Sequence, residues 1–294
     1  MRVGFIGLGR MGSGMVGRIL EHGHDLAVYD VIAASTAKAA EAGARVAASV
    51  RELCDGRDVV ITMLAEDAAV HDVACGEGGL RDSLPAGAIH LAMGTYGIGT
   101  IRTLAAAHAA AGQTLVAAPV LGRPDLAATG QLGIVSGGPD AAVERCGPLF
   151  TILGRLRFHA GELPESASAI KLAKNLVLGC AIQAMDEAFS LFRKYDVQPQ
   201  VLYDVMTEGL FSAPAYKVYG KIMVEEGYER AGSTIALNLK DANLILGAGD
   251  IARVPLPSGN TFRDRLLSAI AHGDANKDVA ALALEQARAC GLTS

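Results

Sequence analysis

Short apolar runs alternate with helix-patterned segments from Met1 to about residue 160. Helical spacing predicts helices at Ala33–Glu41, Asp67–Val73 and Thr100–Ala111. This alternation predicts a largely parallel sheet that is covered by helices on both faces. The apolar runs predict strands at Arg2–Ile6, Leu26–Tyr29, Asp58–Met63, Ala88–Leu91, Leu115–Ala118, Ile134–Ser136 and Leu156–His159.

The pattern changes after Pro164. Glu165 to Lys194 contains no proline and one glycine, so it predicts one long helix. Its middle, Leu176 to Met185, is apolar on every side apart from Gln183, and a helix of this kind is expected to be covered on all faces. The apolar run is too short to cross a bilayer, and charged residues flank it.

The remainder of the chain predicts helices alone. We therefore expect an α/β domain over residues 1–163, followed by an all-α domain over residues 164–294 that is built on the long central helix. Gly291 is the expected C-cap of the last helix. The downstream helices are expected to begin near Pro199, Ala213, Ser233, Ser258 and Asp278.

A glycine pattern joins the first expected strand to the first expected helix. Gly7 permits a tight turn, Gly9 lets the backbone approach a pyrophosphate, and Gly12 lets the helix pack on the strand. Strand, glycine turn and helix are the context in which this spacing indicates dinucleotide binding. Residues 1–163 are thus expected to form a Rossmann dinucleotide-binding domain. Its cofactor-binding turn is expected to comprise Gly7, Leu8, Gly9, Arg10, Met11 and Gly12.

Asp30 ends the second expected strand, 18 residues after Gly12. This is close to the spacing of about 20 residues at which a carboxylate binds the ribose hydroxyls of NAD. A carboxylate there repels the 2′-phosphate of NADP, and the next cation along the chain is Lys38. We therefore expect NAD as the cofactor, with NADP disfavoured.

Composition excludes several classes of partner. The formal net charge is −5 and no run of Lys or Arg stands out, so nucleic acid is not expected as a partner. The five cysteines are scattered without a C-x-x-C pair, which favours a reduced, cytoplasmic compartment. The histidines show no metal-site spacing. The chain enters a strand at once, so neither a signal peptide nor a membrane association is expected.

Four motifs, in order along the chain, resemble those of the β-hydroxyacid dehydrogenases related to 3-hydroxyisobutyrate dehydrogenase. The resemblance implies an NAD-dependent dehydrogenase or reductase of small 3-hydroxy acids or the matching semialdehydes or ketones. It also implies a homodimer or homotetramer joined through the helical domains. The motifs are Gly4–Gly12, Ala118–Gly122, Lys171-Leu-Ala-Lys-Asn175 and Leu239-Lys240-Asp241.

The resemblance assigns Lys171 and Asn175 as the catalytic pair. A lysine whose pKa is brought toward neutrality can remove or return the hydroxyl proton. Asn175, four residues on, shares its helix face and could hold the substrate hydroxyl or orient the lysine. From the residues alone, Lys171 is an ordinary solvated lysine. Lys174 is the rival, but its own i+4 neighbour is Leu178, which offers no polar partner.

Further residues are assigned to the cofactor by the same resemblance. Lys240 and Thr95 are expected near the nicotinamide, and Met63 and Leu64 are expected to line the cofactor through their backbone. The sequence alone also allows each of these residues a purely structural role. Lys240 could extend along apolar surface, Thr95 could stabilise a turn, and the other two could pack in the core.

The expected substrate loop, Leu121, Gly122 and Arg123, departs from the family's Pro-Val-Ser-Gly-Gly. Leu121 replaces a serine hydroxyl, whereas Gly122 can still offer a close backbone N–H. Arg123 introduces a fork suited to a carboxylate or similar anion, or it faces water in a Gly-Arg-Pro-Asp turn. A small anionic or carbonyl substrate is expected, and its identity stays open.

Three other functions compete with this expectation. An imine reductase of the same fold would carry Asp or Tyr in place of Lys171. A non-catalytic nucleotide-binding homologue would be expected to lose the Lys171–Asn175 pair. An interaction protein that docks through the apolar helix leaves the glycine turn and Asp30 unexplained.

Overall fold

The structure is a computed structural model that describes residues 1–292. The chain divides into two compact units, Met1–Lys171 and Leu172–Ser294. The boundary that the sequence predicts, between residues 163 and 164, coincides with the start of helix α10 (Pro164–Lys194). That helix begins in the first unit and continues in the second, so the domain boundary at 163/164 stays a prediction.

The first unit contains a six-stranded sheet in the order β3-β2-β1-β4-β5-β6, and every neighbouring pair in it is parallel. This is the strand order of a Rossmann fold, which confirms the predicted fold class. The edge strand β3, two residues long, was not predicted. The strands are β1 (Arg2–Ile6), β2 (Asp25–Tyr29), β3 (Arg45–Val46), β4 (Val59–Thr62), β5 (Ile89–Ala92) and β6 (Thr114–Ala117).

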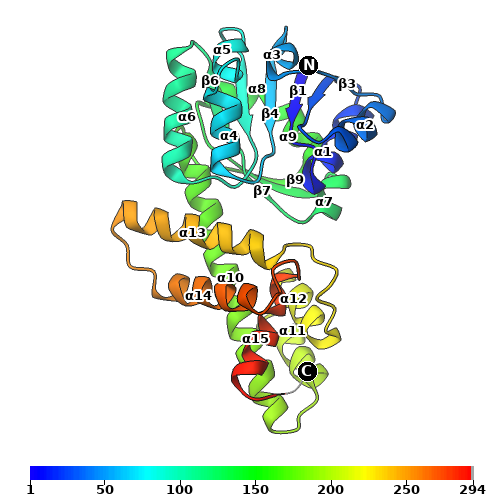
Figure 1. The fold of residues 1–294 in the computed structure, drawn as a ribbon, viewed down its shortest axis with the longest axis vertical. Helices are drawn as coiled ribbons and strands as arrows, with labels where there is room; N and C mark the ends of the chain where they lie inside the picture. Colours follow the sequence, from blue (N-terminus) through cyan, green and yellow to red (C-terminus); the bar gives the residue numbers. More distant parts are fainter. Residues whose placement is uncertain (293–294) are drawn as a thin grey trace. The chain divides into compact units, whose positions relative to one another are not determined.

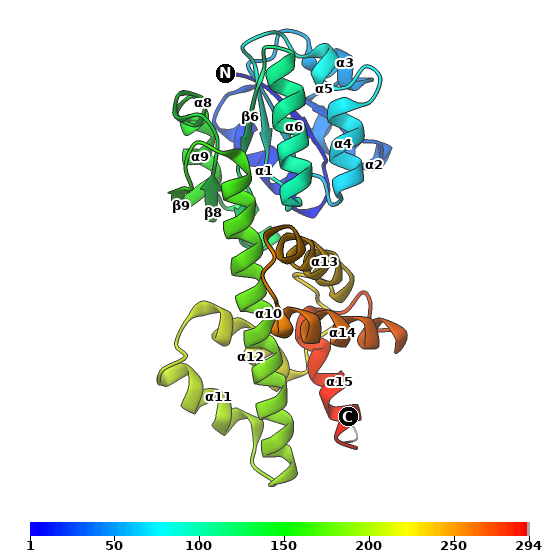
Figure 2. The same cartoon turned by 90° about the vertical axis from the view of Figure 1, so that its left-hand side faces the viewer.

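Helices cover both faces of this sheet, as predicted. In both views α4 and α6 lie side by side over one face (Figures 1 and 2), while α1 packs against α9 on the other. The helices of the unit are α1 (Arg10–Glu21), α2 (Ala33–Glu41), α3 (Val50–Cys54), α4 (Asp67–Cys75), α5 (Leu80–Ser83), α6 (Ile98–Ala110), α7 (Pro124–Ala128), α8 (Asp140–Arg145) and α9 (Gly147–Leu153).

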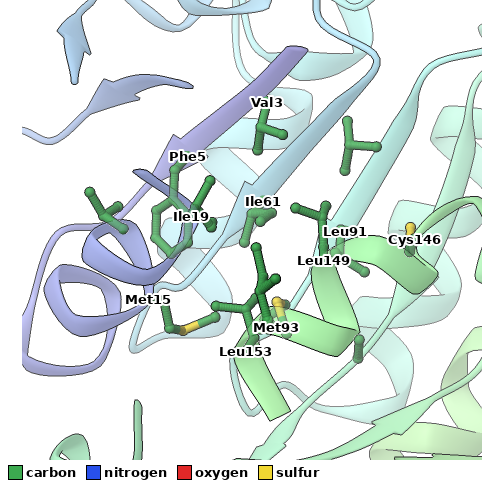
Figure 3. Close-up of a cluster of buried hydrophobic side chains, with 14 of the residues drawn as sticks. Val3, Phe5, Met15, Ile19, Ile61, Leu91, Met93, Cys146, Leu149 and Leu153 are labelled. Atoms are coloured by element: carbon green, nitrogen blue, oxygen red, sulfur yellow. The ribbon is translucent and has the colours of Figure 1, made fainter. Parts of the chain in front are cut away.

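Alternate residues of each strand enter two separate cores, because successive side chains of a strand point to opposite faces. Ile61 belongs to the core beneath α1 and α9, whereas Val60 belongs to the core beneath the helices α3 to α6. Burial on both faces explains why these strands read as continuous apolar runs. Figure 3 shows the first core, in which side chains of the strands face side chains of α1 and α9. The strands contribute Val3, Phe5, Ile61 and Leu91, α1 contributes Met15 and Ile19, and α9 contributes Leu149 and Leu153.

A second, three-stranded sheet follows in the order β7-β8-β9, formed by β7 (Val120–Leu121), β8 (Leu132–Ser136) and β9 (Gly154–His159). The prediction that the last two strands extend the first sheet is wrong, and β7 was not predicted. Strand β7 pairs antiparallel with β8. The short connection between them holds just the one-turn helix α7, and parallel strands need a longer crossover.

The described part of the second unit is helical, as predicted, and its core gathers side chains from α10, α12, α13 and α14 around the segment Val279–Leu282. Among the described residues, none of the helices combines the length and the apolar character that a membrane span needs. The helices after α10 are α11 (Pro199–Glu208), α12 (Pro214–Glu225), α13 (Ile235–Ala252), α14 (Pro257–Ala271) and α15 (Leu282–Ala289). Gly291 follows the last helix with φ +63°, as expected of a glycine at a helix end.

Within a single chain, helix α10 is not covered on all faces, so the predicted full cover of this helix needs a second copy. Ile182 and Met185 are buried in the core of the second unit. On another side of the helix, Val177 is 70% exposed. The sequence is apolar on both sides of this helix, but the chain supplies neighbours for one side.

Candidate active site

The glycine turn between β1 and α1 is tight at two glycines and open at the third. A Cβ on Gly7 would lie 2.4 Å from the carbonyl oxygen of Met63, and a Cβ on Gly12 would lie 1.9 Å from the carbonyl oxygen of Gly7. Gly7 also has φ +98°. Among the described atoms, nothing lies within 4 Å of a Cβ built on Gly9. The turn is therefore closely packed at Gly7 and Gly12 and has open space beside Gly9. A backbone that a pyrophosphate is to approach closely requires such open space.

Helix α1 begins at this open space. Its N-cap is Gly9, whose carbonyl oxygen accepts the first helical hydrogen bond, from Ser13 N at 2.9 Å. The backbone N–H groups of the first turn, which includes Arg10 and Met11, point out of the helix start, where the helix dipole favours an anion. Leu8 is buried beneath the turn. The helix start fits the phosphates of a dinucleotide.

Asp30 lies at the carboxyl end of β2 beside the glycine turn. One carboxylate oxygen accepts from Leu8 N at 2.6 Å and the other accepts from Ile32 N at 2.8 Å. An ionised carboxylate has about four acceptor positions, so two remain for other donors. The two backbone contacts fix the carboxylate beside the glycine turn.

Met63 and Leu64 follow β4 and lie directly against the glycine turn. Met63 N donates to Ile6 O at 2.9 Å, and Leu64 N donates to the hydroxyl of Tyr96 at 3.1 Å. Thr95 precedes that tyrosine in the loop after β5 and is half-buried. The residues that the sequence assigns to the cofactor in this unit therefore lie together in the loops at the carboxyl ends of the parallel strands.

The expected substrate loop spans β7 and the start of α7. Leu121 is half-buried in β7, and Gly122 has φ +145°, with Leu132 Cδ2 2.8 Å from where its Cβ would be. Arg123 is the N-cap residue of α7, and its side chain is half-buried. Gly122 thus allows a turn that a larger residue would strain.

Lys171 contacts this loop. Its ammonium nitrogen donates to the backbone carbonyl of Val120 at 2.7 Å, and its side chain is half-buried. The contact joins α10 to the residue that immediately precedes Leu121. The catalytic role of Lys171 stays a prediction, and the structure adds its contact with the residue before the expected substrate loop.

In the second unit, Asn175 and Lys240 meet at one carboxylate. Asn175 Nδ2 donates to Asp241 Oδ2 at 2.8 Å, and Lys240 Nζ lies 2.9 Å from Asp241 Oδ1. The side chains of Lys240 and Asp241 are each 14% exposed. Lys174 Nζ donates to Asn175 Oδ1 at 3.4 Å. Asp241 lies at the centre of this group. The sequence analysis includes it in a motif but assigns it no role.

Sequence reasoning also missed Gly14 and Tyr96. A Cβ on Gly14 would lie 2.8 Å from Ala128 N, so this glycine lets α1 pack closely against α7, which follows the expected substrate loop. Its signal in the sequence was a further glycine two positions after Gly12. Tyr96 gave no signal, because its partner Leu64 is 32 residues away.

Two family models match consecutive parts of the chain. The NAD binding domain of 6-phosphogluconate dehydrogenase matches residues 2–161. The NAD-binding region of NADP-dependent 3-hydroxyisobutyrate dehydrogenase matches residues 166–285. Together with the parallel sheet and its glycine turn, these matches define an NAD(P)-dependent dehydrogenase that acts on CH–OH groups.

Individual relatives define the family. The chain is 37% identical to the uncharacterized oxidoreductase YfjR of Bacillus subtilis, over 96% of this chain and 98% of that protein. It is 31% identical to a 3-hydroxyisobutyrate dehydrogenase of Pseudomonas aeruginosa, over 94% of each chain. The protein therefore belongs to the β-hydroxyacid dehydrogenase family. A solved structure of the Mycobacterium tuberculosis 3-hydroxyisobutyrate dehydrogenase with L-serine superposes with a TM-score of 0.88, at 25% identity, over 96% of this chain and 98% of that one.

Proposed function

We propose that the protein transfers a hydride between NAD(H) and a small 3-hydroxy acid or the corresponding semialdehyde or ketone, with Lys171 as general acid and base. The observation that carries the proposal is the hydrogen bond from the Lys171 ammonium to the carbonyl of Val120, at 2.7 Å. It fixes the ionisable nitrogen beside Leu121, Gly122 and Arg123, the residues expected to bind substrate.

Lys171 supplies the proton transfer that the reaction needs. In oxidation the neutral amine removes the hydroxyl proton while the hydride leaves the adjacent carbon; in reduction the ammonium returns the proton to the carbonyl oxygen. When bound, NAD accepts or returns that hydride at C4 of its nicotinamide. A neutral amine keeps two N–H donors, so it can remain bound to Val120 O while its lone pair accepts the proton.

Asn175 acts beside Lys171 on α10, with its amide oriented by Asp241. Because Asn175 Nδ2 donates to a carboxylate at 2.8 Å, its Oδ1 is turned away from that partner. A fixed amide oxygen can accept a hydrogen bond from an ammonium or from a substrate hydroxyl. Lys240 contacts the same carboxylate and is proposed to lie near the nicotinamide, as the family resemblance implies.

A substrate screen tests this proposal. NADH absorbance is followed with small 3-hydroxy acids, the matching semialdehydes and ketones, and one cyclic imine. Turnover of a hydroxy acid or its carbonyl partner supports the proposal. Turnover of the imine alone would assign the protein to the imine reductases. Tight NADH binding without turnover of any member would favour a non-catalytic homologue.

NAD(H) is expected to be preferred over NADP(H). Two backbone contacts fix the Asp30 carboxylate beside the glycine turn, where it is proposed to bind the ribose, and a 2′-phosphate there would meet like charge. Steady-state kinetics with both cofactors, at a saturating concentration of the same substrate, measures the preference. A lower KM for NADP(H) than for NAD(H) would contradict it.

The exposed side of α10 supports assembly into a homodimer or homotetramer. Ile170, Val177, Ala184 and Leu191 recur every seven residues along the helix and are all exposed in the single chain. Residues at this spacing form one continuous stripe. Burying the stripe against a second copy would provide the cover that the sequence predicts for this helix.

Val177→Glu is expected to convert the assembly to monomers, because the stripe would then bury a charge without a partner. Size-exclusion chromatography with light scattering measures the change. Val205→Glu on α11 is the matched control, since Val205 is 69% exposed and Val177 is 70% exposed. An oligomer that survives Val177→Glu unchanged would exclude this face as the interface.

A further inference from the structure

One carboxylate joins the loops that follow β4 and β5. Asp67, the first residue of α4, accepts from the backbone N–H of Gly97 with both of its oxygens, at 3.1 Å each. Its Oδ2 also accepts from the hydroxyl of Thr100 at 2.6 Å. Asp67 is half-buried. Hydrogen bonds to an ionised carboxylate are stronger than those between neutral groups, so this link holds the two loops firmly together.

The link also caps helix α6, which lies beside α4 (Figures 1 and 2). The N-cap residue of α6 is Gly97, and a glycine has no side chain that could accept from the first helical turn. Asp67 supplies a carboxylate from another helix, at the end of α6 where the helix dipole favours negative charge. The two residues are 30 positions apart in the sequence, so the contact fixes the start of α6 relative to the start of α4.

Thr95 lies in the loop that this link fixes, two residues before Gly97. On its other side, Gly94 lies so close to the loop after β4 that a Cβ there would be 2.7 Å from Leu64 O. The hydroxyl of Tyr96 accepts from Leu64 N at 3.1 Å. The position of Thr95 relative to the loop after β4 is therefore set by close packing before it and by the carboxylate link after it.

The pairing of the strands does not depend on this link. Strands β4 and β5 pair in parallel from Val59 with Ile89 to Thr62 with Ala92. Asp67 lies beyond the last of these pairs. Its replacement is therefore expected to release the loops from one another while the strands stay paired.

We propose that Asp67 is a positioning residue for the nicotinamide half of the cofactor. By holding the start of α6, it keeps Thr95 beside Leu64, and both of these residues are proposed to contact bound NAD(H). The proposal rests on the proposed function, from which these two roles come. It predicts a selective effect, because Asp30 and the glycine turn, which are proposed to hold the ADP-ribose part, belong to the loops after β2 and β1.

The test compares binding of NADH with binding of ADP-ribose, which lacks the nicotinamide, by isothermal titration calorimetry. Asp67→Ala removes the contacts with Gly97 and Thr100, so part of the binding free energy is then used to order the loop. We expect the Kd of NADH to rise about tenfold and the Kd of ADP-ribose to change by less than about twofold. Asp67→Asn keeps an oxygen that can accept from Gly97 N, and it is expected to bind NADH within about threefold of the wild type.

Glu66→Ala is the matched control for charge. Glu66 is the neighbouring carboxylate, it is exposed, and within the described part of the chain its side chain makes no capping hydrogen bond at the start of α4. The Kd of both ligands is expected to stay within about twofold of the wild-type value. If Glu66→Ala weakens NADH binding as much as Asp67→Ala does, the effect is one of charge and the proposal is overturned.

An unchanged Kd for NADH in Asp67→Ala, or an equal loss for ADP-ribose, also overturns the proposal. If Asp67→Ala does not fold, the backbone amide resonance of Gly97 in the wild-type protein decides, as followed by ¹⁵N NMR. NADH is expected to shift this resonance and ADP-ribose to leave it in place, so an equal response to both ligands overturns the proposal. Wild-type protein that binds no NADH would instead reject the proposed function.

Discussion

Replacing Lys171 by alanine is expected to lower kcat by about 10²- to 10⁴-fold, the range by which positioned acid–base groups act. The lysine contacts the proposed substrate loop through Val120 O, whereas the glycine turn and Asp30, which are proposed to hold the dinucleotide, belong to other elements. The Kd of NADH should therefore remain within about twofold of the wild-type value. Steady-state kinetics with the best substrate of the screen, together with NADH titration, separates the two quantities.

Lys174→Ala provides the matched control, because Lys174 lies one turn from Lys171 on the same helix and was the rival candidate. It contacts Asn175 at 3.4 Å, so a loss of less than about tenfold in kcat is expected. If Lys171→Ala keeps activity within a few-fold of wild type, the assignment of the general acid and base is wrong. A large loss in Lys174→Ala alone would transfer the role to that residue.

The second large effect is expected from Gly9→Ala. The open space above Gly9 accommodates a methyl group in the free protein, so the melting temperature should stay near the wild-type value. That space is where the pyrophosphate is proposed to approach the backbone, so the affinity for NADH is expected to fall by about 100-fold, the equivalent of about 2.7 kcal/mol. Thermal unfolding and NADH titration of the same preparation measure both quantities.

Gly17→Ala is the control for a glycine-to-alanine change in the same region. Gly17 lies within α1, and the described atoms leave the position of its Cβ open as well. It is expected to bind NADH normally and to gain about 0.5–1 kcal/mol in unfolding free energy, since alanine is the better helix former. Gly12→Ala is unsuitable, because its Cβ would meet Gly7 O at 1.9 Å and disturb the fold itself. Normal NADH binding by Gly9→Ala would refute the proposed pyrophosphate site.

The sequence predicted those elements whose pattern is local. Strands buried on both faces, such as β4, gave continuous apolar runs, and α2 was predicted with the bounds it has in the structure. The edge strand Arg45–Val46 is exposed and two residues long, so no run marks it. The separate β7–β8–β9 sheet depends on the turn at Gly122, which the spacing of apolar residues does not encode.

For the candidate site, motifs predicted which residues gather at the sheet edge, but they did not give the contacts. The spacing of Asp30 from Gly12 pointed to a carboxylate beside the glycine turn, and the structure places it on Leu8 N. By contrast, nothing in the sequence pairs His90 with His108, since this contact arises from the packing of α6 on β5. Long-range polar contacts of this kind depend on tertiary structure, which the pattern of residues in a single sequence does not reveal.

The lysine at position 171 is held by a main-chain carbonyl, and every amino acid at position 120 would supply one. Side chains around it can therefore be exchanged without removing the partner of the proposed acid–base group. Directed evolution at Leu121 and Arg123 is accordingly a route to new substrate preference with the proton-transfer apparatus retained.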